Sequence, residues 1–226
     1  MIDMTIRENI QKIKDEIGPD VILVGATKMN DATRVAEAVA SGLEYCGENR
    51  VQELLEKNSL GAYEGSHIHF IGRLQKNKVK YIVGLAELIH SADSIELIRT
   101  IDKCASNRGL IQDILLEINI GEEANKGGFS KDSIYDVLAL TDTLSSVRVR
   151  GLMAIPPICT EPAQNRPYFE QMHELFVDIK GKKYDNNSMD FLSMGMSGDY
   201  LEAVKCGSNM IRVGTGIFGP RNYDKT

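Results

Sequence analysis

The fold is decided by residues 21–28, which read Val21-Ile22-Leu23-Val24-Gly25-Ala26-Thr27-Lys28. The first seven form a continuous, mostly apolar run, which is typical of a strand buried on both faces in a parallel sheet. Before it, residues 4–17 carry methionine and isoleucine at helical spacing, and Gly18-Pro19 ends that segment. We therefore expect an amphipathic helix followed by a buried strand.

The same alternation of strand and helix continues along the chain. After 21–27, further strands are expected near residues 43–46, 67–71, 87–91, 111–120, 147–155, 189–194 and 209–213. Asp31 can cap the helix after the first strand, whose apolar positions include Val35, Ala38 and Val39. Further helical patterns lie near residues 49–58, 75–84, 94–107, 131–144, 164–180 and 199–206. Eight such units predict an α/β protein with a single (β/α)8 TIM-like barrel and an extra N-terminal helix. The rival is an open doubly wound sheet, a fold that rarely needs eight regular repeats.

Composition limits the function classes. The 226 residues are 42% hydrophobic and 26% charged, with a net charge of −6, so nucleic acid and anionic membranes are not expected partners. No apolar run approaches the roughly 20 residues that span a bilayer, and the N-terminus lacks a signal-peptide core. We expect one domain over residues 1–226 and a cytoplasmic location. The four cysteines are scattered, which favours free thiols.

Two short motifs predict an anion site. Residues 192–197 and 210–216 are apolar runs that end in glycine, serine or threonine. Small residues at the carboxyl end of a strand let main-chain N–H groups approach an anion. Barrels often bind phosphate in the loops after strands 7 and 8, where these motifs fall.

Lys28 is the candidate nucleophile. Strand alternation places Ile22, Val24, Ala26 and Lys28 on one face, so the lysine would stand at the mouth of an apolar barrel. Partial desolvation there lowers a lysine pKa and favours the neutral amine that attacks carbonyls. The alternative is a solvated lysine at the start of a loop.

Other polar residues leave alternatives open. Arg212 would point into the barrel, where it could pair with a carboxylate such as Glu117 or donate to a cofactor's heterocyclic nitrogen. A second interpretation pairs Glu117 with Arg150 on the next strand. His67 and His69 share a face, but without a third ligand nearby we expect no metal site. The basic run 75–80 is expected to be a solvated helix face.

The chain resembles the pyridoxal 5′-phosphate (PLP) homeostasis proteins over about residues 21–221. A specific series of motifs carries this resemblance: Gly25-Ala26-Thr27-Lys28, Cys46-Gly47-Glu48-Asn49-Arg50-Val51-Gln52-Glu53, His67-Ile68-His69-Phe70-Ile71-Gly72-Arg73-Leu74-Gln75-Lys76-Asn77-Lys78, Asn119-Ile120, Arg150-Gly151-Leu152-Met153-Ala154-Ile155, Leu192-Ser193-Met194-Gly195-Met196-Ser197 and Arg212-Val213-Gly214-Thr215-Gly216-Ile217-Phe218-Gly219. Arg73 stands where many family members have a smaller or uncharged residue, which could alter the rim of the site.

The resemblance implies a barrel like the N-terminal domain of alanine racemase, with PLP held as a Schiff base on Lys28. It places Arg212 opposite the pyridine nitrogen. The remaining cofactor contacts it implies are Ser193, Met194, Gly214 and Thr215 at the phosphate, and Asn49, Ile71 and Met153 around the ring. Arginine keeps its proton, so the ring nitrogen would stay unprotonated and be a weak electron sink.

Three functions remain open at this point. The first is a PLP-binding protein without clear catalysis, which stores the cofactor or delivers it to PLP-dependent apo-enzymes. The alternative is a PLP-dependent amino-acid racemase or decarboxylase. After the eighth strand and the loop expected over residues 214–219, only residues 220–226 follow. These are too few for the second domain that closes the site in related enzymes, so we expect an open site and a monomer. The third is a Schiff-base aldolase acting on a sugar phosphate without PLP.

Overall fold

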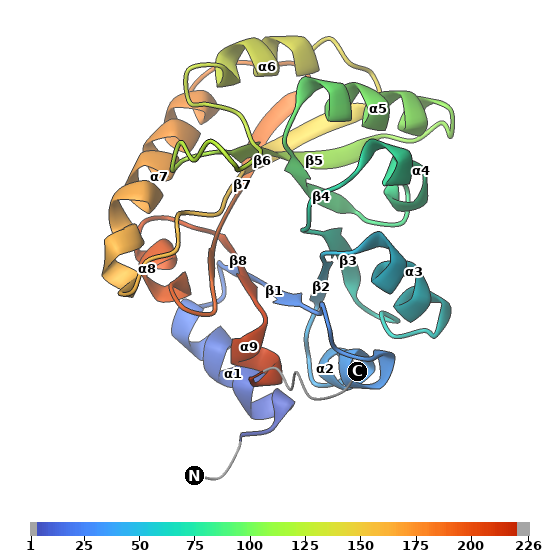
Figure 1. The fold of residues 1–226 in the computed structure, drawn as a ribbon, viewed down its shortest axis with the longest axis vertical. Coiled ribbons are helices and arrows are strands. Elements are labelled where there is room, and N and C mark those ends of the chain that lie inside the picture. The colour runs from blue at the N-terminus through green and yellow to red at the C-terminus, as the bar shows by residue number, and fades with distance from the viewer. Residues whose placement is uncertain (1–3, 221–226) are drawn as a thin grey trace.

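Eight parallel strands close into a barrel in which each strand pairs with its sequence neighbours and the last pairs with the first. The computed structural model describes residues 4–220. Figure 1 looks onto the ring of strands. The strands are β1 Ile22–Ala26, β2 Tyr45–Glu48, β3 His67–Phe70, β4 Leu88–Ala92, β5 Gln112–Ile118, β6 Val147–Ala154, β7 Asn187–Met196 and β8 Met210–Val213. The predicted (β/α)8 barrel is therefore confirmed.

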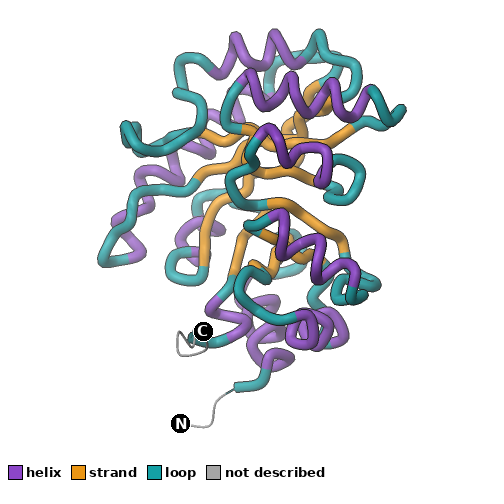
Figure 2. The backbone as a smooth tube through the Cα atoms, turned by 45° about the vertical axis from the view of Figure 1, so that its right-hand side comes forward, coloured by secondary structure: helices purple, strands orange, loops and turns teal. Residues whose placement is uncertain are grey.

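Helices surround the strands, as the purple and orange segments of Figure 2 show. They are α1 Ile6–Ile17, α2 Ala32–Ala40, α3 Val51–Ser59, α4 Val79–Ile82, α5 Ile95–Ser106, α6 Ile134–Thr141, α7 Arg166–Lys180, α8 Tyr200–Lys205 and α9 Thr215–Phe218, with 3-10 turns η1 Lys76–Lys78 and η2 Pro162–Asn165. Two expectations need correction. The helix expected over 75–84 is a 3-10 turn followed by the short α4, and the loop expected over 214–219 contains α9.

The N-terminal helix α1 is stabilised by its sequence at both ends. Thr5 and Glu8 form a capping box, in which the Glu8 N–H donates to Thr5 Oγ1 and the Thr5 N–H to Glu8 Oε2. Gly18 ends the helix with φ +77°. On its buried face, Asn9 Nδ2 donates to the carbonyl oxygen of Ile217 at 3.0 Å. The first helix of the chain thus contacts α9, which follows the last strand (Figure 1).

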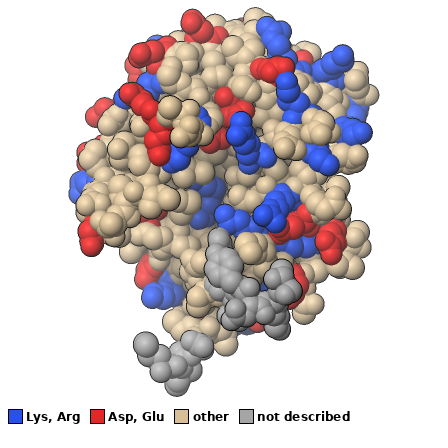
Figure 3. All heavy atoms as spheres, in the orientation of Figure 1, with Lys and Arg blue, Asp and Glu red and all other residues tan. Residues whose placement is uncertain are grey.

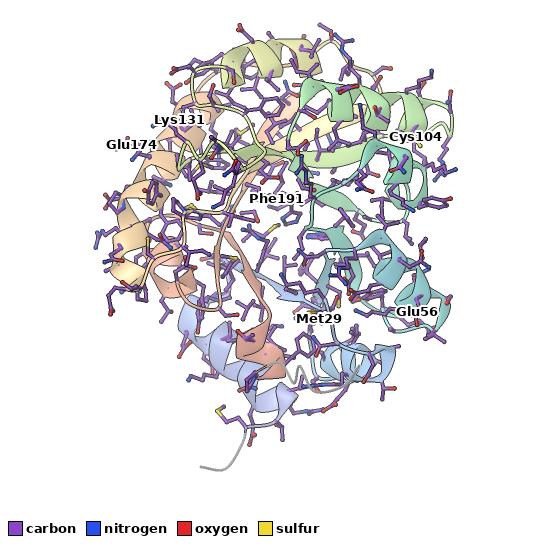
Figure 4. The ribbon with its side chains drawn as sticks, viewed as in Figure 1. Met29, Glu56, Cys104, Lys131, Glu174 and Phe191 are labelled. Atoms are coloured by element: carbon purple, nitrogen blue, oxygen red, sulfur yellow. The ribbon has the colours of Figure 1, made fainter. Side chains whose placement is uncertain are left out.

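The strands bury both faces, as expected for a parallel sheet. Alternate residues pack inside the barrel, in a cluster of Val24, Ala26, Ile71, Leu88, Leu115, Met153 and Met210. Figure 4 shows Phe191, which packs against this cluster, near the centre of the ring. The intervening residues pack between strands and helices. The predicted inward face of Ile22, Val24 and Ala26 is confirmed. No helix within residues 4–220 is long and apolar enough to cross a membrane.

Candidate functional site

Lys28 lies at the carboxyl end of β1, half-buried, beside the end of β8. It lines a cavity of about 280 Å³ together with Ala26, Gly214 and Thr215. The structure thus brings the candidate nucleophile and the second predicted anion motif to one cavity. This placement follows from the closure of the barrel, because β1 and β8 are neighbours only once the sheet has closed.

The turn after Lys28 has an unusual backbone conformation. Met29 adopts φ +61°, a left-handed conformation that side chains other than glycine rarely take. Its N–H donates to Glu53 Oε2 at 2.9 Å, which holds this conformation in place. In Figure 4 Met29 lies at the end of β1. Asp31 then caps α2 by accepting from the N–H of Arg34, as predicted. The turn therefore fixes where the chain leaves the strand directly after Lys28.

A buried network of charged side chains lies next to this turn and holds the end of β1. Lys57 is 5% exposed and Glu48 is fully buried, and the two side chains form an ion pair. Lys57 Nζ also donates to the carbonyl oxygen of Thr27 at 2.9 Å and approaches Glu53 Oε2 at 3.2 Å. Thr27 Oγ1 donates to Glu48 Oε1 at 2.8 Å. The network joins the ends of β1 and β2 to α3, so it positions the residue that precedes Lys28.

Sequence reasoning missed this network. Glu48 ends a strand that is otherwise mostly apolar, and Glu53 and Lys57 stand four residues apart on the following helix. An acidic residue at a buried strand end is the signal that could have found it, since a buried charge needs a partner. Its partner, however, is nine residues away, on a different element.

Arg212 lies inside the barrel with its guanidinium bound to uncharged acceptors. Nη1 donates to Ser193 Oγ at 2.6 Å, and Nη2 donates to the carbonyl oxygen of Ala154 at 3.0 Å. Burial lowers the pKa of Arg212 to about 10, while Glu117 and Asp199 oppose this shift. The side chain is therefore still protonated at neutral pH. It carries a positive charge into the barrel with donors left for a further acceptor.

The sequence left two possible partners for Glu117, namely Arg212 and Arg150, and in the described structure it forms an ion pair with neither. Arg150 pairs with Asp113 and Asp190, each at 2.6 Å, so the interpretation that pairs it with Glu117 is wrong. Glu117 makes no ion pair within 4.0 Å among residues 4–220, although it lies close enough to Arg212 for a charge interaction. Burial raises the pKa of Glu117, Asp93 adds to this, and Arg212 opposes it.

Two residues of the motif at the end of β7, Ser193 and Met194, have buried side chains in different environments. Ser193 is fully buried, and its hydroxyl lies between Arg212 and His90. The Met194 side chain packs between the barrel and the helices. Any contact of these two residues with a phosphate would therefore come from their main chain, and that contact stays a prediction.

Ser197, at the end of the same motif, is the residue that faces the glycine-rich turn. Its Oγ accepts hydrogen bonds from the N–H groups of Gly214 at 3.1 Å and Gly216 at 3.3 Å. The two N–H groups thus converge on one oxygen atom, as an anion-binding turn requires. Ser197 was inside the predicted motif, but its spacing from Gly214 gave no reason to single it out.

Asn49, Ile71 and Met153 lie around the barrel mouth. Ile71 and Met153 belong to the apolar cluster inside the barrel that also contains Ala26. Asn49 follows β2, and its Oδ1 is buried without a hydrogen-bond partner in the described structure. An unpaired buried carbonyl oxygen is rare and marks a place where a donor is missing.

A larger cavity of about 970 Å³ adjoins Asn49 on the side of β3 and β4. Its basic lining residues are Arg50, Arg73, Lys76 and Lys78. Lys and Arg side chains gather around the middle of the face shown in Figure 3. Arg73 points outward, since its side chain is 81% exposed, and it lies 3.8 Å from Asp93. The basic run therefore lies at the surface, as expected, and forms the rim of a cavity.

The two histidines of the H-x-H pair differ in environment. His67 is exposed and interacts with Glu87, whereas His69 is buried with its Nδ1 3.0 Å from His90 Nε2. Burial lowers the pKa of His69 to about 3, and His67 adds to this. Among the described residues, no group of three or more histidine, cysteine or acidic side chains is arranged to hold a metal ion.

Gly72 allows the strand ends at this mouth to pack closely. A Cβ atom at position 72 would lie 2.2 Å from the carbonyl oxygen of Asn49. Gly72→Ala is expected to lower the free energy of unfolding by about 1–3 kcal/mol, because main-chain atoms would have to move apart. Urea unfolding measures this. Gly198→Ala is the control, since no atom lies within 4 Å of its Cβ position; equal effects of the two substitutions would contradict the steric argument.

The chain is similar to known proteins along nearly its whole length. Residues 4–222 match the family described as alanine racemase, N-terminal domain. The chain is 40% identical over 221 residues to the pyridoxal phosphate homeostasis protein of Aquifex aeolicus strain VF5, and the match covers 96% of each. PipY of Synechococcus elongatus PCC7942, solved without PLP, superimposes with a TM-score of 0.89 at 32% identity over 95% of this chain and 100% of PipY. The PLP-bound PipY structure gives 0.86 at 31%, with the same coverage.

The barrel, with a lysine after its first strand and a glycine-rich turn after its last, defines the class of the alanine racemase N-terminal domain. Within this class, the chain belongs to the pyridoxal phosphate homeostasis protein family. The resemblance drawn from the motifs is thereby confirmed.

Proposed function

We propose that this protein binds PLP, takes part in intracellular PLP homeostasis and holds the cofactor as a Schiff base on Lys28. The observation that carries the proposal is that Lys28 and the Gly214–Thr215 turn line one cavity. PLP has an aldehyde and a phosphate on one small ring, so two such neighbouring groups suit it. The name of the Aquifex aeolicus relative and the PLP in the second PipY structure support the same assignment.

The covalent step needs only the lysine amine. Unprotonated Lys28 Nζ attacks the aldehyde carbon, a carbon–nitrogen double bond forms, and the aldehyde oxygen leaves as water. Hydrolysis reverses the step and releases PLP. A half-buried lysine at an open barrel mouth suits both directions, because water can reach the bond. This reversibility is what a protein that stores or delivers the cofactor requires.

The neighbouring residues fit the rest of PLP. The N–H groups of Gly214 and Gly216 already point at one oxygen, that of Ser197, and a phosphate oxygen could be bound in the same way. The unpaired Asn49 Oδ1 offers an acceptor for the ring hydroxyl. Thr215 would add its hydroxyl, Ser193 and Met194 their main chain, and Ile71 and Met153 an apolar surface for the ring.

Arg212 argues for a carrier and against an enzyme. When bound, PLP can supply an electron sink for carbanion chemistry, and that sink is strongest with the ring nitrogen protonated. Arg212 stays protonated at neutral pH, so opposite that nitrogen it would donate a hydrogen bond and leave the nitrogen unprotonated. We therefore propose storage and delivery of PLP to apo-enzymes over racemisation or decarboxylation.

The experiment is to mix the purified protein with PLP and record near-visible absorbance before and after borohydride reduction. We expect a new absorption band, and peptide mapping that places the reduced adduct on Lys28. The loaded protein should also restore activity to an added PLP-dependent apo-enzyme. Absence of both the band and the adduct would overturn the proposal.

The racemase or decarboxylase alternative has its own readout. The loaded protein is incubated with single enantiomers of amino acids, and the products are separated on a chiral column. We expect no Lys28-dependent turnover, since Arg212 weakens the electron sink. Clear Lys28-dependent turnover would favour the enzyme, even if the Schiff base is confirmed.

A further inference from the structure

A column of polar side chains crosses the interior of the barrel. It links His69 on β3, His90 on β4, Ser193 on β7 and Arg212 on β8, each at most 4% exposed. His69 Nδ1 lies 3.0 Å from His90 Nε2, and His90 Nδ1 lies 3.1 Å from Ser193 Oγ. Ser193 Oγ in turn accepts from Arg212 Nη1 at 2.6 Å. Four strands are thus connected by three consecutive hydrogen bonds that end at the arginine.

Both histidines in the column are neutral. Burial lowers the pKa of His90 well below its ordinary value, and the neighbouring His69 and Arg212 lower it further. A neutral imidazole has one donor and one acceptor nitrogen. The hydrogen bonds along the column must therefore be donated in a consistent direction. Arg212 sets this direction, because a guanidinium can only donate.

Only one direction gives the hydroxyl hydrogen of Ser193 an acceptor within the column. Arg212 donates to Ser193 Oγ, the Ser193 hydroxyl donates to His90 Nδ1, and His90 Nε2–H donates to His69 Nδ1. In the reverse direction, Ser193 would accept from both neighbours, and its own hydrogen would have no acceptor in the column. Unmade hydrogen bonds in a dry interior are costly, so the first direction is favoured.

We propose that His90 is a positioning residue for the cofactor: through Ser193 it holds the Arg212 guanidinium facing the ring nitrogen of PLP. This inference rests on the proposed function. The column differs from an ion pair in its effect on the charge of Arg212. A carboxylate partner would neutralise the arginine, whereas a hydroxyl and the carbonyl oxygen of Ala154 fix its orientation and preserve its charge. Donation by Ser193 to His90 also makes the serine oxygen a better acceptor.

Two substitutions at one site test the role. His90→Leu removes the acceptor for Ser193, whereas His90→Asn keeps an oxygen near the position of Nδ1. After loading with PLP, we expect His90→Leu to release PLP about three- to tenfold faster than wild type, the effect of one lost hydrogen bond, with a shifted visible absorption maximum. His90→Asn should stay within about twofold of wild type. Stopped-flow transfer of PLP to an apo-enzyme measures the rates.

A second variant and a cofactor-free measurement keep the test decisive. Ser193→Ala removes only the linking hydroxyl and should reproduce the His90→Leu rate and spectrum, even if the leucine variant fails to fold. In the apoprotein, ¹⁵N NMR of labelled histidine should show His90 as a neutral imidazole protonated on Nε2. A Ser193→Ala protein with wild-type release and spectrum, or a His90 protonated on Nδ1, would overturn the proposal. Absence of any PLP adduct in wild type would instead overturn the proposed function, because the NMR result stands without PLP.

Discussion

Lys28→Ala is expected to abolish the borohydride-stable PLP adduct completely. The substitution removes the amine that would form the bond, while the Gly214 and Gly216 N–H groups and Arg212 remain in place. PLP should therefore still bind, but weakly and without the Schiff-base absorption band. Intact-mass spectrometry after borohydride reduction is the direct measurement, because the adduct adds a fixed mass to the chain.

Two further variants make the Lys28 result specific. Lys28→Arg keeps a positive charge at the site but cannot release its proton to attack an aldehyde, so it should also lack the adduct. Lys12→Ala, on the exposed face of α1, should keep the full adduct. Retention of one reduced PLP per chain by Lys28→Ala would show that another lysine forms the bond and that the site has been assigned wrongly.

Lys57→Met is expected to lower the free energy of unfolding by about 3–5 kcal/mol, the range found when one partner of a buried ion pair is removed. The fully buried Glu48 would lose its cation, and the carbonyl oxygen of Thr27 would lose a donor. The double variant Glu48→Gln with Lys57→Met should be less destabilised than the single one, since no fully buried charge is left without its partner. Urea unfolding of the wild type, Lys57→Met, Glu48→Gln and the double variant gives the coupling energy.

An exposed ion pair provides the control for the Lys57 prediction. Lys182 pairs with Asp178 on the surface, with side chains about half exposed. Lys182→Met should lower the free energy of unfolding far less than Lys57→Met, because solvent screens exposed ion pairs. If Lys57→Met were no more destabilising than Lys182→Met, the buried network would not hold the end of β1, and the account of how Lys28 is positioned would be wrong.

Much of the barrel was predictable because its signals are local. The run 21–27 identifies a buried strand without knowledge of its neighbours, and the alternation of strand and helix recurs along the chain. The ends of the helices were less predictable where helix propensity and tertiary packing favour different lengths. Residues 75–84 looked like one helix, yet only residues 76–82 form helical turns. The helix ends at Ile82, two residues before Gly84, whose φ of +77° takes the backbone out of the helical conformation.

The site was predictable in its residues more than in its contacts. Lys28 and the Gly214 turn follow from strand ends, and barrel closure brings them together. The partners of buried polar groups depend on neighbours across the sheet, which spacing along the chain does not reveal. Arg150 thus pairs with Asp113 and Asp190, and Ser193 faces Arg212.

The pairing of β1 with β8 places the two halves of the site at opposite ends of the amino-acid sequence. Val24 lies opposite Arg212 in this pairing, and α1 donates to α9 through Asn9. In a nascent chain from which β8 has not yet emerged, Lys28 would be present without the Gly214–Gly216 turn proposed to bind the phosphate. Binding of PLP at full affinity would then begin only after residue 216 has emerged from the ribosome and β8 has paired with β1 to close the barrel. Cofactor loading could thus report that the protein has finished folding.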